Sequence, residues 1–188
     1  MKQKIFAALL GLCFSFAAHA ANPQVEMKTN FGSITLELYA DKAPKTVANF
    51  LSYVKSGFYQ GLIFHRVIDN FMIQGGGFDT QLREKETAGK IQNEANNGLK
   101  NETYTIAMAR TSAPHSATAQ FFINLKDNDN LNHTGPTMQG WGYAVFGKVV
   151  KGQDVVMKIA KTRVSAQGPF SSDVPQQVVE IEAMKLLP

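Results

Sequence analysis

Hydrophobic and polar residues alternate along the first segments that follow residue 20. Residues 25–29 (VEMKT) and 34–38 (ITLEL) both show this two-residue period, which is typical of strands with one buried face. The residues between them, 30–33 (NFGS), form a turn signal. We therefore expect the chain to open with a β-hairpin.

The hydrophobic period then changes to that of an α-helix. Pro44 suits a first helical position and Gly57 suits a helix stop. Between them, one apolar face at the spacing i, i+3, i+4, i+7 is formed by Val47, Phe50, Leu51 and Val54. A second, shorter helix is predicted over residues 154–161, where apolar side chains again gather on one side.

The rest of the chain consists of short apolar runs separated by glycine and asparagine. We expect strands at 62–68 (LIFHRVI), 71–76 (FMIQGG), 104–110 (YTIAMAR), 120–125 (QFFINL), 143–150 (YAVFGKVV) and 177–187 (QVVEIEAMKLL). About eight strands with two helices favour a closed or sandwiched antiparallel sheet, since closure removes exposed strand edges. No repeat, linker or low-complexity segment interrupts the pattern, so one domain is expected.

The first 20 residues have a different character. Two lysines precede an apolar run at 5–18, and the segment ends in the small-x-small pattern Ala18-His19-Ala20. This is the pattern of a secretory signal peptide, which predicts cleavage before Ala21 and a mature domain of residues 21–188. A membrane anchor fits less well, because the apolar run is shorter than the ~20 residues of a spanning helix.

Composition narrows the chemistry of the mature chain. The chain is 44% hydrophobic and 18% charged, as in globular proteins, and its single cysteine, Cys13, lies in the predicted signal peptide. The 19 Lys and Arg against 15 Asp and Glu give a net charge of +4, and loss of Lys2 and Lys4 leaves 17 against 15, or +2. Neither this charge nor any run of like charges indicates nucleic-acid binding.

Several common site types lack their patterns. No two of the mature histidines lie at i, i+4, and no cysteine accompanies them, so no metal site is predicted from His65, His115 and His133. The glycines at 75–77 lack the spacing of a phosphate loop, and close backbone approach explains them better. No G-x-S-x-G motif supports a hydrolytic triad.

Polar residues inside apolar strands are the remaining signal. In 64–77 (FHRVIDNFMIQGGG), Arg66 and Gln74 interrupt two apolar runs. If both runs are extended, Phe64 shares a face with Arg66, and Met72 shares one with Gln74. Neighbouring Phe121 and Phe122 must point to opposite faces, so one can fill the interior while the other lines an outer groove. Such a groove, with polar groups at its edge, suits an extended peptide.

Four segments together resemble the cyclophilin family of peptidyl-prolyl cis-trans isomerases, and the likeness runs from Val25 to Pro188 in family order. They are FHRVIDNFMIQGG, TIAMAR, SATAQFFINL and YAVFGKVVKG. The resemblance implies a mainly β fold, a closed eight-stranded antiparallel barrel capped by two helices, with the active site on its outer face. The signal peptide and the GYAVFGKV form look most like the exported bacterial members.

The resemblance also implies the site. The family's catalytic arginine falls on Arg66, and the other catalytic positions fall on Phe71, Gln74 and Phe122. Gln74 is expected either to orient Arg66 or to bind the substrate backbone. Substrate-binding positions fall on Met72, Ala109, Arg110, Gln120, Leu131 and Tyr143.

Some positions depart from the commonest family pattern. Asn130 stands where a tryptophan that contributes to cyclosporin binding usually sits, so weak or absent cyclosporin binding is expected. Tyr143 replaces a pocket histidine, and Arg110 replaces an asparagine and adds a cation beside the groove. Tyr104 occupies a position that is usually glycine. Trp141, in the loop that follows Leu131, either rims the pocket or packs against the barrel end.

These implications define the expected function. The chain is expected to accelerate rotation about X-Pro bonds in exported proteins and so assist their folding in the periplasm. Its expected partners are proline-containing polypeptides in unfolded or extended form. No cofactor, metal, nucleic acid or membrane is expected to take part once the signal is removed, and we expect a monomer. The alternative is a non-catalytic proline-peptide binding module or chaperone on the same fold.

Overall fold

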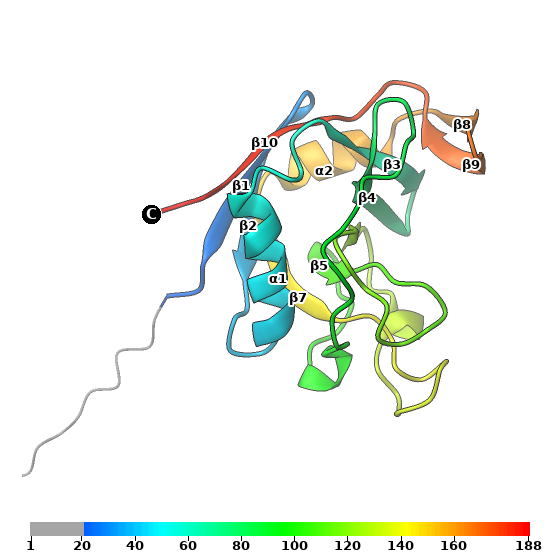
Figure 1. Ribbon diagram of the computed structural model, residues 1–188. Coiled ribbons are helices and arrows are strands. Elements are labelled where there is room, and N and C mark those ends of the chain that lie inside the picture. The colour runs from blue at the N-terminus through cyan, green and yellow to red at the C-terminus, as the bar shows by residue number, and fades with distance from the viewer. Residues whose placement is uncertain (1–20) are drawn as a thin grey trace, which may run out of the picture.

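The computed structural model describes residues 21–188, and the predicted signal peptide at 1–20 lies outside them. Eight of the strands form one antiparallel sheet in the order β10-β1-β2-β7-β5-β6-β4-β3 (Figure 1). Their bounds are β1 Gln24–Thr29, β2 Gly32–Leu38, β3 Leu62–Ile68, β4 Met72–Asp79, β5 Thr105–Met108, β6 Phe121–Asn124, β7 Val145–Lys151 and β10 Ile181–Leu186. The predicted opening hairpin is confirmed as β1 and β2.

The two ends of this sheet meet, so it forms a nearly closed barrel. The amide of Gly61 donates to the carbonyl of Ile181 at 2.9 Å, and the amide of Phe64 donates to that of Val179 at 2.9 Å. Ile63 and Glu180 form an antiparallel bridge between them. The mainly β barrel expected from the sequence is thereby confirmed. Within residues 21–188, no helix has the length and apolar character needed to cross a membrane.

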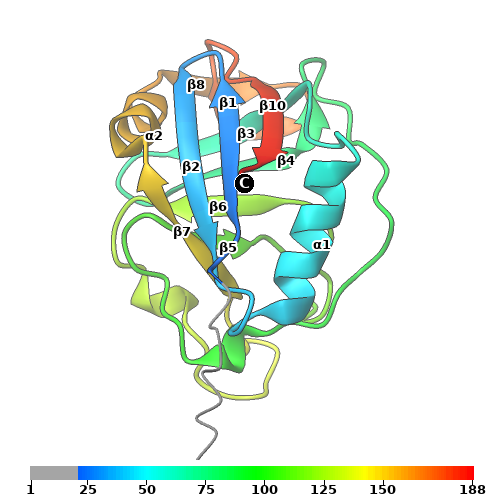
Figure 2. The ribbon, with the colours of Figure 1, turned by 90° about the vertical axis from the view of Figure 1, so that its left-hand side faces the viewer.

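Two helices pack on the barrel from opposite sides (Figure 2). Helix α1 spans Pro44–Lys55 and buries Val47, Phe50 and Val54, as its spacing predicted. Helix α2 spans Gln153–Ala160 and buries Val156 and Ile159. Two short 3₁₀ turns complete the helical elements, η1 at Ala95–Asn97 and η2 at Asp129–Leu131.

A β-bulge in β3 changes which residues share a face. Phe64 pairs with Gly75 and Arg66 with Gln74, so His65 is an extra residue on β3. Phe64 is consequently buried in the barrel core, whereas Arg66 lies half-exposed on the outer surface. The prediction that Phe64 and Arg66 share a face is therefore wrong, because it assumed an unbroken pleat. Met72 and Gln74 do share the outer face.

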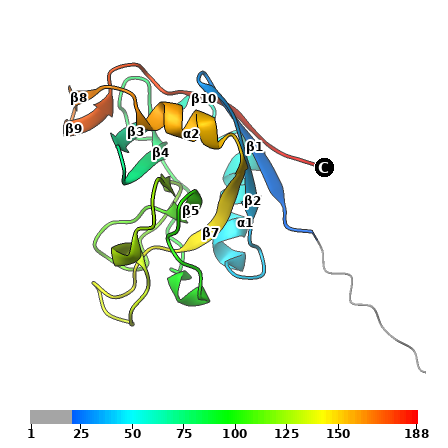
Figure 3. The ribbon, with the colours of Figure 1, turned by 180° about the vertical axis from the view of Figure 1, so that it is seen from behind.

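A small hairpin that the hydrophobic pattern did not predict lies beside β3. It consists of β8 (Val164–Gln167) and β9 (Phe170–Pro175), and Figures 1 and 3 both show it next to β3. The ring of Phe170 packs 5.4 Å from that of His65 and 5.0 Å from that of Phe78, measured between centroids. The hairpin therefore covers the bulged histidine.

Buried asparagines support the long connections around β6. The side-chain amide of Asn128 donates to the Phe71 carbonyl at 2.9 Å and to Asn124 Oδ1 at 2.7 Å. The amide of Asn101 donates to the carbonyl of Leu131 at 3.1 Å. Because buried polar groups need partners, these side chains fix the loops in one arrangement.

Tyr104 has a left-handed backbone conformation, with φ of 66°. Glycine adopts this region without strain, whereas a residue with a Cβ does not. This left-handed conformation explains why glycine is the usual residue at this position in the family that the sequence resembles. In this chain the Tyr104 ring packs against the barrel core, a contact that glycine does not make.

His65 gives the fold a testable dependence on pH. The side chain is buried, and burial, followed by the nearby positive charge of Arg66, lowers its pKa from 6.5 to about 4. Between pH 6.5 and 4 the unfolded chain binds a proton that the folded chain does not, so stability falls as the pH is lowered. We expect a loss of up to about 3 kcal/mol across this window.

The measurement is urea unfolding of the wild type and of His65→Phe at several pH values from 7 to 4. The variant keeps a ring between its aromatic neighbours and loses the titrating group. Its stability should therefore fall less over the same window. Equal slopes in the two proteins would contradict the assignment to His65.

Candidate active site

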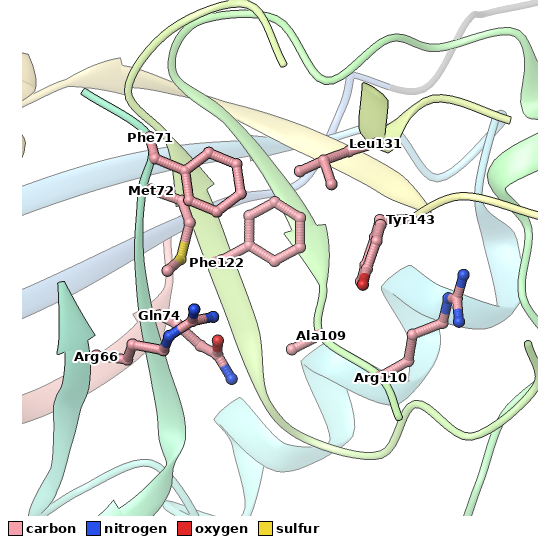
Figure 4. Close-up of a pocket in the computed structure, with 9 residues that line it drawn as sticks. All are labelled: Arg66, Phe71, Met72, Gln74, Ala109, Arg110, Phe122, Leu131 and Tyr143. Carbon is pink, nitrogen blue, oxygen red and sulfur yellow. The ribbon is translucent and has the colours of Figure 1, made fainter. Parts of the chain in front are cut away.

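A small pocket of about 120 Å³ opens on the outer face of the barrel. Its residues come from β3, β4 and β6, from the end of β5 and η2, and from the loop before β7 (Figure 4). Nine of the ten site residues expected from the sequence line it: Arg66, Phe71, Met72, Gln74, Ala109, Arg110, Phe122, Leu131 and Tyr143. The tertiary structure thus brings together residues from five separate parts of the chain.

The apolar lining follows from the pleat of β6. Phe121 is fully buried in the barrel core, and Phe122, its neighbour, belongs to a separate outer cluster with Met72 and Val145. The prediction that the two rings point to opposite faces is confirmed. The rings of Phe122 and Tyr143 meet edge to face with centroids 5.5 Å apart, a favourable aromatic geometry. Together these side chains form the apolar wall and floor of the pocket.

Arg66 is the cation at the edge of this wall. Its side chain is 43% exposed, and its Nε lies 3.6 Å from Oδ2 of Asp173 on the β8–β9 hairpin. Within residues 21–188, the terminal nitrogens of the guanidinium donate no hydrogen bond to the protein. These donors are therefore free to bind a group that enters the pocket.

Gln74 bonds to Gln120 rather than to Arg66. The side-chain amide of Gln74 donates to Oε1 of Gln120 at 3.0 Å. Gln120 can lie there because residue 77 is glycine, and a Cβ at Gly77 would come within 2.5 Å of the Gln120 side chain. The glycine therefore serves close approach, as the sequence indicated. Both expected uses of Gln74, orienting Arg66 and binding a substrate backbone, stay predictions.

Arg110 forms one wall of the pocket without presenting a free charge. Its guanidinium stacks on the ring of Tyr143 at 4.6 Å, on the far side from Phe122 (Figure 4). Its Nε donates to the carbonyl of Gly142 at 2.9 Å, and Nη1 donates to that of Thr111 at 2.9 Å. The added cation expected from the sequence is thus engaged by loop carbonyls and supports the tyrosine ring.

The Trp141 loop packs against the protein and does not line the pocket. The indole lies between the rings of His115 and His133, with centroids 4.8 and 5.2 Å away. Nδ1 of His133 also lies 3.0 Å from the Trp141 carbonyl oxygen. Of the two alternatives for Trp141, packing is the one observed. Asn130 is exposed beside the pocket and does not line it.

A second, larger cavity of about 350 Å³ adjoins the first. The two share Gln74, Ala109 and Arg110, and Gln120, the tenth expected site residue, lines only the second. Its other lining side chains are mostly polar and include Glu84 and Lys90. The two cavities form a groove with one apolar end and one polar end.

Sequence reasoning missed two sets of residues behind this site. The first is the asparagine network, in which Asn101 and Asn128 fix the carbonyls of Phe71 and Leu131. The spacing of Asn124, Asn128 and Asn132 was its only sequence signal. The second is Asp173, whose position 107 residues after Arg66 carried no signal at all.

This arrangement suits binding and electrostatic stabilisation. It offers an apolar pocket, free guanidinium donors and a hydrogen-bonded amide pair. No group of three His, Cys, Asp or Glu side chains in the described part of the chain is placed to hold a metal ion. These components suit a reaction in which rotation about a conjugated bond leaves a lone pair localised on one atom, where a donor can bind it.

Comparisons with known proteins identify the family. The model of the cyclophilin type peptidyl-prolyl cis-trans isomerases matches residues 24–186. A peptidyl-prolyl cis-trans isomerase of Streptomyces antibioticus is 60% identical over 87% of this chain and 98% of its own length. One of Acinetobacter baylyi is 56% identical over 99% of this chain and 96% of its own length.

The solved structures agree with the sequences. A cyclophilin type peptidyl-prolyl cis-trans isomerase of Cryptosporidium parvum, crystallised in the presence of the dipeptide Ala-Pro, superposes with a TM-score of 0.71. The two sequences are 27% identical, and the match covers 88% of this chain and 99% of the Cryptosporidium chain. The non-catalytic alternative has no support among these relatives. The chain therefore belongs to the cyclophilin-type peptidyl-prolyl cis-trans isomerases, and its activity is the isomerisation of peptide bonds that precede proline.

Proposed function

We propose that this isomerase acts on exported proteins and that the pocket around Arg66 performs the reaction. The single observation that carries the site is the pair of free guanidinium nitrogens beside an apolar pocket. The apolar side chains Phe71, Met72, Phe122 and Leu131 receive the proline ring. Gln74 and Gln120 hydrogen-bond the substrate backbone beside it.

The reaction needs a donor that acts only when the bond twists. Amide resonance resists rotation with a barrier of about 18–20 kcal/mol. Rotation removes the resonance and leaves a lone pair on the proline nitrogen that can accept a hydrogen bond. A guanidinium of Arg66 directed at that nitrogen forms a bond that strengthens as the twist develops, which is selective binding of the transition state.

Magnitudes show that Arg66 does not act alone. An acceleration of about five decades corresponds to about 7 kcal/mol. One hydrogen bond to a charged group contributes roughly 1.5–3 kcal/mol. The remainder comes from the pocket, which holds the proline ring while the groove holds the chain on either side. The apolar surroundings also strengthen the arginine's interaction by excluding water.

The groove accounts for an extended substrate. The Cryptosporidium relative was crystallised with Ala-Pro, and a proline in the pocket of this chain would leave the adjoining polar cavity to neighbouring substrate residues. Proline-containing segments in unfolded proteins are extended and accessible, so they fit such a groove. Assistance to protein folding follows, because X-Pro isomerisation is slow enough to limit folding.

The export part of the proposal rests on residues 1–20. The family model begins at residue 24. The match to the Streptomyces relative spans 98% of that relative and 87% of this chain. The family model thus does not include the first 20 residues. Their basic start, apolar run and Ala18-His19-Ala20 ending direct the protein to the periplasm.

Replacing Arg66 by alanine tests the mechanism. We expect kcat/KM in a proline-peptide assay to fall by more than about tenfold, or about 1.4 kcal/mol, because the donor to the twisted amide is lost. The melting temperature should hardly change, since the side chain is half-exposed. Arg83→Ala is the matched control, because Arg83 also pairs with an aspartate, Asp79, outside the pocket. Activity of Arg66→Ala within twofold of wild type, measured by NMR exchange on one X-Pro peptide, would refute the mechanism.

Replacing Phe122 by alanine tests the pocket. We expect peptide affinity to fall by about tenfold, because the ring supplies much of the apolar contact to proline. Phe31→Ala, which removes a partly buried ring outside the pocket, should leave affinity unchanged. Titration of a proline peptide, with thermal melts to check the fold, makes the comparison. An unchanged affinity in Phe122→Ala would remove this ring from the binding site.

Cleavage of residues 1–20 tests export. When the full chain is expressed in a bacterium with a periplasm, the periplasmic fraction should contain a protein that begins at Ala21, as mass spectrometry can determine. A double substitution of Ala18 and Ala20 by leucine should block cleavage, since the processing site requires small residues. His19→Ala keeps that pattern and should be cleaved normally. An uncleaved wild-type protein in the cytoplasmic fraction would contradict the proposal.

A further inference from the structure

The carboxylate of Asp173 pairs with the Arg66 guanidinium, although Asp173 itself does not line the pocket. Its Oδ2 lies 3.6 Å from Nε of Arg66, and the side chain is only 28% exposed. Among the described residues, this ion pair is the one interaction of the Arg66 guanidinium with a charged group. Arg66 itself lines the pocket. The Nε of its guanidinium is thus paired with a carboxylate, while among the described residues its terminal nitrogens have no such partner.

The backbone at Asp173 is strained in a way that presents this carboxylate. Its φ is 67°, in the left-handed region that residues with a Cβ rarely adopt. Such a conformation persists only where the surroundings impose it, and such residues gather at functional sites. Val174 and Pro175, which follow it, are buried, so they fix the strand on one side of the strained residue.

The other side of the strained residue is anchored by an aromatic contact. Phe170 begins β9 and packs on His65, which immediately precedes Arg66 in β3. The same ring meets Phe78 of β4 edge to face at 5.0 Å. The hairpin therefore packs against the two strands that carry Arg66 and Gln74, which keeps Asp173 close to the guanidinium.

We propose that Asp173 is a positioning residue for isomerisation, which holds the Arg66 guanidinium so that its terminal nitrogens face the pocket. The inference rests on the proposed role of Arg66. A free arginine side chain has many rotamers, and fixing one of them before the substrate arrives lowers the cost of reaching the transition state. The β8–β9 hairpin thereby becomes part of the catalytic apparatus.

The sign of the effect separates positioning from simple electrostatics. A carboxylate beside the guanidinium weakens its positive potential, so removal of the carboxylate would raise turnover if charge alone mattered. If orientation matters, removal lowers turnover. Because the peptide still binds through the apolar pocket, orientation should change kcat and leave KM nearly constant.

Two substitutions of Asp173 and one control make the test. Asp173→Asn keeps a polar oxygen near Nε without the charge and tolerates the left-handed backbone, whereas Asp173→Gly tolerates the backbone and removes the side chain. We expect kcat to fall by about two- to fivefold in the glycine variant and less in the asparagine variant. Ser172→Ala, an exposed neighbour in the same strand, should have wild-type kinetics.

Two further measurements show whether the effect passes through Arg66. In ¹⁵N NMR, the Nε–H signal of Arg66, identified by its absence in Arg66→Ala, should move towards that of a free arginine in Asp173→Gly. The double variant Arg66→Ala/Asp173→Gly should be as active as Arg66→Ala alone, because no guanidinium remains to be positioned.

The outcomes are distinguishable. Loss of activity in Arg66→Ala with unchanged or raised kcat in Asp173→Gly overturns the positioning role and leaves the proposed function standing. An additive loss in the double variant, or an unmoved Nε–H signal, overturns it as well. Wild-type activity in Arg66→Ala overturns both the mechanism and this inference. A stepwise fall in kcat from wild type to Asp173→Asn and then to Asp173→Gly, together with the NMR shift, supports the positioning role.

Discussion

The pleat of β6 places Phe121 inside the barrel and Phe122 outside it, and the remaining architecture depends on that division. Phe121 meets the rings of Phe50 and Phe64 edge to face, with centroids 5.8 and 5.9 Å away, and so closes the core. Phe122, one residue later, becomes the centre of a surface pocket. A packed interior and an apolar site can coexist in one small domain because a strand has two faces.

A site on the outside of a barrel suits a reaction that requires little chemistry. Rotation about an amide needs no proton transfer or covalent intermediate, so a shaped pocket and a directed donor would suffice for the proposed mechanism. The supports therefore matter as much as the pocket itself. The buried amides of Asn101 and Asn128 hold the loops that carry Leu131 and Phe71. Arg110, bonded to the Gly142 carbonyl, stacks on the ring of Tyr143.

Where the pleat is interrupted, the site gains its polar members. The bulge at His65 turns Arg66 outward, next to Gln74, although Phe64 two residues earlier is in the core. The glycine at 77 admits the side chain of Gln120 beside Gln74. The strained backbone of Asp173 brings a carboxylate to the arginine. These three features lie at or next to the groove, although the fold has other bulges and left-handed residues away from it.

The sequence by itself determined the family and most of the elements, but not the β8–β9 hairpin. Alternation and helical spacing are local properties, so they predicted the opening hairpin, both helices and the opposite faces of Phe121 and Phe122. The family motifs carried eight of the nine pocket residues, and the family resemblance placed the ninth, Leu131. Only the tertiary structure decided the bulge at His65, the Asp173 contact and the packing of Trp141 between two histidines. These depend on partners that are distant in the chain or on one inserted residue, and no local hydrophobic pattern records either.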